Sequence, residues 1–217
     1  MKHEGIKKVL EVQQVLKSNL DEQVPQLSTN CEPTYKRSID YEDGKFALSE
    51  VNGKRHLMLS AKAARYNFSN VKLFTIKPSS QSRFQEVIEL LPQQVFRISC
   101  TIKSQTLSQD TEYVCYLVFK LSETCQGLHY PVKVRDLLQQ ENKEAEIIYF
   151  TSPSSWNIHD ITRVPQQRED GCMEVYVWKY NSNHQLKSDC LLVNLKFTSY
   201  EGTMSGLTVY GLEFRPL

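Results

Sequence analysis

The sequence predicts an all-β fold, an antiparallel sandwich or barrel, for most of this 217-residue chain. Two observations indicate this class. Short runs rich in Val, Ile, Tyr, Phe and Thr follow one another from Phe46 onward at intervals of roughly 10 to 25 residues, with turn residues between them. In CLLVNLKF (190–197), apolar and polar residues alternate. This period is typical of a strand that has one face in water.

A helix is predicted before the strands, over residues 6–20. Its apolar face at helical spacing is Ile6, Val9, Leu10, Val12, Leu16 and Leu20. The stretch that follows contains two prolines and mixed polar residues, and we interpret it as a linker. We therefore expect an amphipathic helix and linker over residues 1–44, with the helix able to dock a protein partner. The β-sandwich domain is expected over residues 45–217.

The predicted strands follow in order along the domain. They are HLMLSA (56–61), VKLFTI (71–76), QVFRISCTIK (94–103), EYVCYLVFKL (112–121), EIIYFT (146–151), MEVYVWKY (173–180), CLLVNLKFTSY (190–200) and LTVYGLEFR (207–215). The run at 113–121 is apolar on both sides, as a central strand would be. Two minor helical insertions are also expected, SRFQEVIELL (82–91) and VKVRDLLQQENKEAE (132–146).

The last strand changes its apolar phase at Gly211. Leu207 and Val209 occupy odd positions, whereas Leu212 and Phe214 occupy even ones. One extra residue at Gly211 would form a β-bulge and direct all four side chains into the same core. We therefore expect this strand to lie inside the sheet.

Charge and motif content exclude several classes of function. The net charge of +1 gives no whole-molecule field for nucleic acid, and no run is long and apolar enough to span a membrane. The chain has no phosphate-binding glycine loop, no zinc protease motif and no nucleophile elbow. The five histidines lack metal-ligand spacing, and the six cysteines lack close pairs. We expect an intracellular, non-enzymatic protein with reduced thiols, no cofactor and no metal.

Four linked phrases carry a resemblance to a known family. They are MLSAKAARYNF from Met58, SRFQEVIELLPQQVFRISCTIKSQTLSQDTEYVCYLVFKL from Ser82, REDGCMEVYVWKY from Arg168, and GLTVYGLEFRP from Gly206. In this order they resemble the plant phloem protein 2 family, the Nictaba-like lectins, over roughly residues 45 to 217.

The resemblance implies a jelly-roll-like β-sandwich that binds carbohydrate. The ligands it implies are N-acetylglucosamine oligomers or N-glycan cores, on glycans or glycoproteins. Family members are mostly cytoplasmic and nuclear and are linked to stress, defence or phloem. Some are fused to an F-box or a protein kinase segment, although neither motif occurs in this sequence.

The family's sugar site carries over only in part. It is attributed to two tryptophans and two acidic residues. The tryptophan positions fall on Phe68 and Phe74. The first acidic position is kept as Glu174, whereas the second is Lys179, and Cys172 stands where the family has a further tryptophan. Phe can stack on a pyranose ring. Lysine, however, places a hydrogen-bond donor where the family has a carboxylate that accepts hydrogen bonds from sugar hydroxyls.

Two hypotheses follow, a sugar-binding module with an altered site and a protein-interaction module on the same fold. A period of two predicts a second platform, with Glu174, Tyr176, Trp178 and Tyr180 on one face. Exposed, that face would suit a sugar or a peptide; we favour the alternative, that it is sandwich core. The sugar hypothesis requires Phe68, Phe74 and Glu174 to converge on one exposed groove.

Overall fold

The computed structural model describes residues 36–41, 45–64, 73–123, 125, 127–138, 145–152, 163–181 and 189–217. Two of our predictions, the N-terminal helix and the position of Phe68, concern residues outside these ranges and stay predictions. The all-β prediction is confirmed in the part that is described, where the regular elements are strands and one 3₁₀ turn at Ser104–Thr106.

The strands form two antiparallel sheets. The larger one contains β1 (Lys36–Tyr41), β2 (Phe46–Val51), β3 (Lys54–Ser60), β4 (Phe74–Pro78), β5 (Glu86–Leu90), β7 (Glu112–Leu121), β10 (Gln166–Gln167), β11 (Met173–Asn181) and β13 (Leu207–Pro216). The smaller one contains β6 (Val95–Lys103), β8 (Val132–Asp136), β9 (Glu146–Ile148) and β12 (Cys190–Ser199).

Strand order places β13 and β7 at the centre of the larger sheet. Its main path runs β1-β2-β3-β13-β7-β11-β10, and the β4–β5 hairpin joins it through pairing of β5 with β13. The four-stranded sheet runs β6-β12-β8-β9. The strand at the C-terminal end of the sequence therefore lies inside the sheet, as its apolar pattern predicts.

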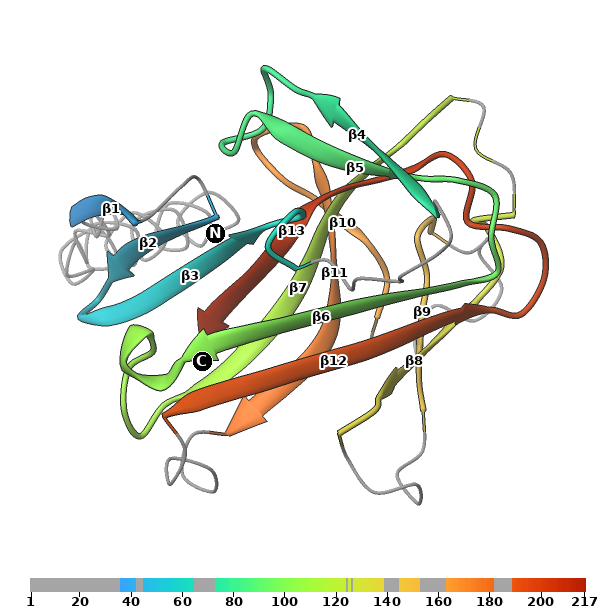
Figure 1. Cartoon of the computed structure of the whole chain (residues 1–217). Helices are drawn as coiled ribbons and strands as arrows, with labels where there is room; N and C mark the ends of the chain where they lie inside the picture. Colours follow the sequence, from blue (N-terminus) through green and yellow to red (C-terminus); the bar gives the residue numbers. More distant parts are fainter. Residues whose placement is uncertain are drawn as a thin grey trace, which may run out of the picture. The chain divides into compact units, whose positions relative to one another are not determined.

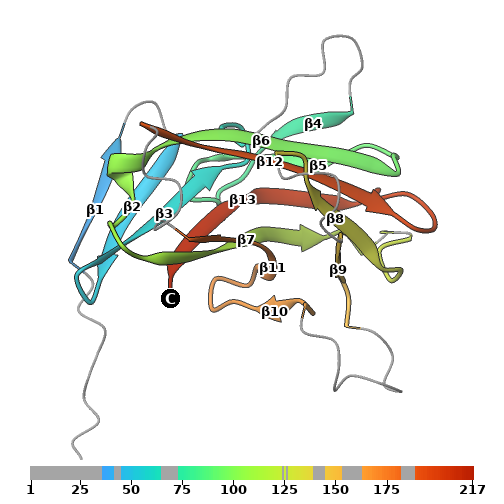
Figure 2. The same ribbon diagram turned by 90° about the horizontal axis from the view of Figure 1, so that it is seen from below.

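One hydrophobic core lies between the two sheets. In Figure 1, β6 and β12 pass in front of β7, and Figure 2 shows the two layers in the turned view. Phe96 stacks on Phe197 with ring centroids 4.3 Å apart, and Phe119 meets the edge of Phe150 at 5.0 Å. Side chains of both sheets belong to this one buried cluster, which makes the arrangement sandwich-like. We call the face of each sheet that points away from this core its outer face.

The predicted bulge in β13 is confirmed. The pairing of β13 with β7 shifts between Val209 and Gly211, and the four side chains on either side of the shift all belong to the inner core. A Cβ atom at Gly211 would lie 2.0 Å from the carbonyl oxygen of Leu59 on β3. Only glycine allows the two strands to approach this closely.

Both predicted helical insertions contain a strand instead, and those predictions are wrong where the structure describes them. Residues 82–91 contain β5, whose Val87 and Ile88 are buried on opposite faces. Adjacent apolar residues are common in amphipathic helices, which is why this segment resembled one. Here Ile88 is buried in the inner core and Val87 in a separate apolar cluster on the outer face. Residues 132–146 begin with β8, in which Val132 and Val134 are buried in the core.

Strand β1 lies in the segment that we interpreted as a linker. Ile39 is opposite Leu48 and Tyr41 is opposite Phe46 in its pairing with β2. A hairpin partner can impose strand structure on a sequence whose own alternation is weak. The domain boundary near residue 44 stays a prediction, with β1 on its N-terminal side.

Five cysteines lie in the described residues and none of them forms a disulfide there: Cys100, Cys115, Cys125, Cys172 and Cys190. Burial raises the pKa of Cys100 to about 12 and holds the pKa of Cys115 well above its ordinary value. Both thiols therefore stay protonated and behave as small apolar side chains. Among the described residues, no helix is long and apolar enough to cross a membrane.

Candidate functional site

Four charged side chains meet on the outer face of the nine-stranded sheet. We call them the ion cluster: Arg168, which follows β10, Glu174 on β11, and Glu213 and Arg215 on β13. Strand β7 lies between β11 and β13, so the side chains reach one another across it. The bulge in β13 gives Glu213 and Arg215 this orientation, because it keeps Leu212 and Phe214 in the core.

Glu174 is the centre of the ion cluster. Arg215 binds it through two parallel hydrogen bonds, from Nη1 to Oε1 at 2.7 Å and from Nη2 to Oε2 at 2.5 Å. Arg168 donates from Nη1 to Oε2 at 2.6 Å. The Glu174 side chain is only 8% exposed. Both carboxylate oxygens are therefore occupied by arginines in a site with little water.

The second carboxylate, Glu213, closes the ion cluster. Its Oε2 accepts from Arg168 at 2.5 Å and from Arg215 at 2.9 Å. Burial by itself would raise the pKa of Glu213, but the hydrogen bonds and positive charges of Arg215 and Arg168 outweigh burial and lower it. The two carboxylates also raise the pKa of both arginines against the effect of burial. Glu213 and both arginines are therefore charged, and the ion cluster contains equal numbers of carboxylates and guanidinium groups.

The turn at residues 168–172 holds Arg168 in place. Its backbone N–H donates to the carbonyl of Cys172 at 2.9 Å, and Asp170 accepts from Arg168 Nε at 3.2 Å. Asp170 also accepts from the N–H of Cys172 at 2.9 Å. Burial acts to raise the pKa of Asp170, but the Cys172 N–H and the Arg168 charge together lower it. The REDG phrase thus positions an arginine.

Two tyrosines extend this face beside the ion cluster. The guanidinium of Arg215 lies 4.5 Å from the ring centroid of Tyr116, and that of Arg163 lies 4.0 Å from the ring of Tyr176. The two rings are 6.3 Å apart. Arg163 also pairs with Glu146 at 3.0 Å. The rings that would be available for stacking a sugar are therefore already in contact with arginines.

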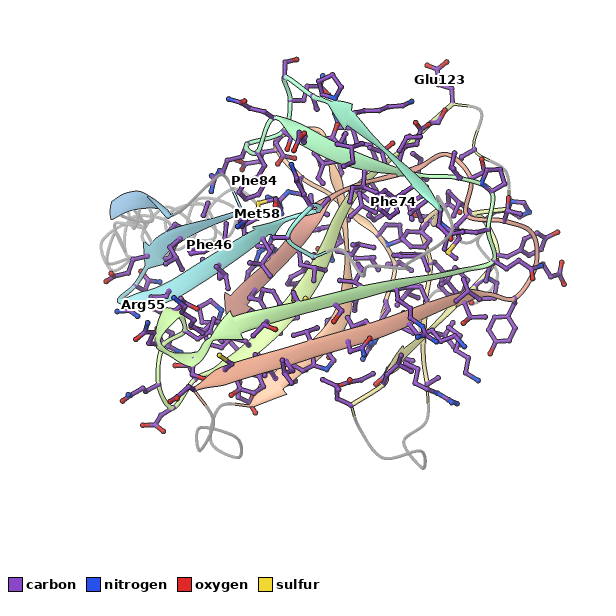
Figure 3. All side chains as sticks on the ribbon, in the orientation of Figure 1. Phe46, Arg55, Met58, Phe74, Phe84 and Glu123 are labelled. Carbon is purple, nitrogen blue, oxygen red and sulfur yellow. The ribbon has the colours of Figure 1, made fainter. Side chains whose placement is uncertain are left out.

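The predicted site residues do not gather at one place among the described residues. Glu174 lies in the ion cluster on the outer face, whereas Phe74 packs against the inner core and lines a cavity of about 40 Å³. Figure 3 shows Phe74 on β4. Lys179 is exposed and pairs with Glu112 at 2.9 Å. Because Phe68 lies outside the described residues, its relation to the other three stays a prediction.

The idea that Glu174 shares one face with three aromatic residues is wrong. The pairing of β11 with β7 shifts between Tyr176 and Trp178. Beyond this bulge Trp178 and Tyr180 belong to the core, whereas Tyr176 lies on the outer face. The indole N–H of Trp178 donates to Asp136 of β8 at 2.9 Å, which ties the two sheets together. The core interpretation therefore holds for these last two aromatics only.

Sequence reasoning missed Arg168, Glu213 and Arg215. Each lies in one of the phrases that carry the family resemblance, REDG and LEFRP, so a signal was present. The sequence did not show that β11 and β13 lie on either side of β7. Their long side chains can therefore meet across this one strand. Within the described part, no group of three or more His, Cys, Asp or Glu residues could hold a metal ion.

Comparisons with known proteins agree with the sequence phrases. The sequence model of the family described as phloem protein 2 matches residues 54–216. Three relatives from Arabidopsis thaliana cover 81% of this chain: F-box protein At2g02240 at 34% identity, putative F-box protein PP2-B2 at 31%, and F-box protein SKIP3 at 30%. The chain spans 56%, 58% and 62% of their respective lengths.

One solved structure also has partial similarity. It is the crystal structure of the Podospora anserina GH26-CBM35 β-(1,4)-mannanase, with a TM-score of 0.42 at 8% identity. The match covers 75% of this chain and 28% of that one.

Proposed function

Because the chain belongs to the phloem protein 2 family, we propose that it is a recognition module on a lectin-related fold whose ligand is a protein rather than a sugar. The observation that carries this proposal is the state of Glu174. Its two oxygens accept hydrogen bonds from Arg168 and Arg215. A sugar hydroxyl would have to displace a charged arginine that binds Glu174 through two hydrogen bonds.

The other predicted site residues support the same choice. Lys179 places a donor where the family has a carboxylate, and it is already paired with Glu112. Phe74 packs against the core rather than presenting an open face. A sugar site needs a stacking ring and a free acceptor at one place, and Phe74 and Glu174 lie on different faces.

Sugar binding is the second candidate. It is favoured by membership of a lectin-related family and by the retention of Glu174 in the family's DG phrase. The ligands would be N-acetylglucosamine oligomers or N-glycan cores, and a site would need Phe68 to supply the stacking ring. This candidate requires the ion cluster to open when sugar binds.

The relatives' names support a wider architecture. They are called F-box proteins, and the chain corresponds to little more than half of their length. We include in the proposal that the domain acts by binding rather than by catalysis, as the recognition part of an F-box-linked system. A cytoplasmic or nuclear location belongs to the same proposal.

A glycan array tests the choice between protein and sugar. We expect no binding of N-acetylglucosamine oligomers or N-glycans by the intact protein. Two variants sharpen the test: Lys179→Glu restores the family's acidic residue, and Lys62→Glu is its matched control. Both lysines are exposed and each pairs with a glutamate.

The results separate the two candidates. Specific binding by the intact protein would overturn the proposal. If only Lys179→Glu gains sugar binding, the family site is present apart from one charge, and the second candidate is correct. If none of the three proteins binds sugar, the proposed function stands.

A further inference from the structure

The outer face of the four-stranded sheet is basic. We call it the basic face, and its cations are Arg97, Lys103, Lys133, Arg135 and Lys196. Two carboxylates also lie on these strands, but both are engaged elsewhere. Asp136 accepts from the Trp178 indole, and Glu146 pairs with Arg163. Lys133, Arg135 and Lys196 thus give this face positive charge that no ion pair with a described residue offsets.

Strand register brings four of these cations close together. Lys196 on β12 is directly opposite Arg97 on β6 and Arg135 on β8. Lys133 is two positions from Arg135 on the same strand. With strands about 4.8 Å apart and about 7 Å between alternate residues, the four Cα positions lie within roughly 12 Å. Such spacing matches the reach of several carboxylates on one extended chain.

The placement of Lys196 opposite Arg135 costs folding energy, and neither cation has an ion pair with a described residue. Like charges directly opposite on neighbouring strands repel one another. Lys133, Arg135 and Lys196 have no ion pair with any described residue, whereas Lys62, which follows β3, and Lys77 on β4 each pair with a glutamate. A binding partner that supplies negative charge would remove the repulsion.

Two exposed apolar side chains accompany the cations. Leu192, on the same face of β12, is 55% exposed, and Tyr200, which follows β12, is 56% exposed. They favour a ligand with apolar side chains as well as negative charges. The net charge of +1 gives no long-range field of the kind that a polyanionic nucleic acid uses. An acidic protein segment fits both features.

We propose that the outer face of the four-stranded sheet binds an acidic protein segment. Its carboxylates lie over the row formed by Arg97, Lys196 and Arg135, and an apolar side chain covers Leu192. The inference rests on the proposed function, because it names the chemistry of the protein ligand and the surface that receives it. This surface is distinct from the ion cluster, which lies on the other sheet.

The test measures binding of a labelled peptide of alternating Glu and Leu to the full chain by fluorescence anisotropy. A peptide with Gln in place of Glu, a single-stranded oligonucleotide and phosphatidylserine vesicles are the comparison ligands. The test variant is Lys196→Gln with Arg135→Gln. The matched control is Arg83→Gln, an exposed arginine on the β4–β5 turn with no ion pair to the described residues.

We expect the Glu peptide to bind the intact protein more tightly than every comparison ligand. The double variant should weaken its binding about tenfold or more, and the control should change it less than about twofold. Binding should also weaken as salt is raised. The double variant should melt at the same temperature as the intact protein or higher, because repulsion is removed. Lost binding therefore cannot be attributed to misfolding.

Three results would overturn the inference: no binding of the Glu peptide by the intact protein, equal binding by the double variant and the control, or tighter binding of the oligonucleotide or the vesicles. None of these results implies sugar binding, which the glycan array measures separately. Failure of this inference and failure of the proposed function are therefore distinguishable.

Discussion

The outer faces of the two sheets differ in how their charged side chains are paired. On the nine-stranded sheet, two arginines and two glutamates neutralise one another within 2.9 Å. On the four-stranded sheet, cations are opposite cations, as Lys196 is to Arg97 and Arg135. Charges that are satisfied internally stabilise the fold, whereas charges without an ion pair to a described residue, as on Arg135 and Lys196, remain available to a ligand. Glu174, which sequence phrases favour as a ligand contact, is thus already bound by two arginines of the same domain.

The largest expected effect follows from removing the centre of the ion cluster. Glu174→Ala leaves Arg168 and Arg215 without their shared carboxylate in a site that is mostly buried. Breaking such a pair costs about 3–5 kcal/mol of unfolding free energy. Urea unfolding measures it. Glu86→Ala, which breaks an exposed pair with Lys62, is the control and should cost less than about 1 kcal/mol. Equal losses in the two variants would show that the ion cluster is not structural.

The next effect concerns the bulge that places Glu213 and Arg215 on the outer face. Gly211→Ala should cost about 3 kcal/mol, because its Cβ would lie 2.0 Å from the Leu59 carbonyl oxygen. Gly53→Ala is the control. Its Cβ meets nothing within 4 Å, so only the positive φ of 74° should matter, at about 1–2 kcal/mol. A Gly211→Ala protein as stable as the control would refute the close approach of β13 to β3.

Acid should weaken the ion cluster in a defined pH range. The folded pKa of Glu213 lies below its ordinary value of 4.5, so its stabilising effect is fully present above that pH. The effect is lost as pH falls through the lower, folded pKa. Glu213→Gln should therefore be less stable than the intact protein at neutral pH, and the difference should shrink in acid. Thermal melts of both proteins from pH 7 to about pH 3 measure it; a constant difference would contradict the assignment.

The smallest effect has the opposite sign and belongs to the basic face. Lys196→Gln should gain about 0.2–1 kcal/mol of unfolding free energy, because two facing repulsions disappear. Lys179→Gln is the comparison on the other sheet, where the lysine has a partner in Glu112 and no gain is expected. Urea unfolding at low salt resolves the difference best. A loss of stability in Lys196→Gln would mean that this lysine has a compensating contact.

Two bulges show what the sequence could and could not predict about the fold. In β13 the apolar phase changes at a glycine, so both the position and the cause were visible. In β11 the residues from Tyr176 to Trp178 are all apolar or aromatic, so such side chains occupy both phases. No break in the pattern marks the shift. A period of two therefore wrongly predicted that Trp178 and Tyr180 share a face with Glu174, although the core interpretation holds for these two aromatics.

The candidate site could also be predicted only in part from the sequence. The family phrases predict Glu174 as a sugar contact, which stays a prediction, and the structure places this residue at the centre of the ion cluster. They did not predict its partners, since Arg168 and Arg215 reach it only after β7 is inserted between β11 and β13. The basic face was missed for a related reason. Arg97, Arg135 and Lys196 are far apart in sequence and become neighbours only through strand register.

A double-mutant cycle between Glu174 and Arg215 tests the central claim, that Glu174 is held by arginines as part of the fold. Unfolding free energies are measured for the intact protein, Glu174→Gln, Arg215→Gln and the variant that carries both changes. The direct contacts of 2.5 Å and 2.7 Å predict a coupling energy of more than about 1.5 kcal/mol. A coupling energy below about 0.5 kcal/mol would contradict the claim, and Glu174 would then be available to contact a ligand.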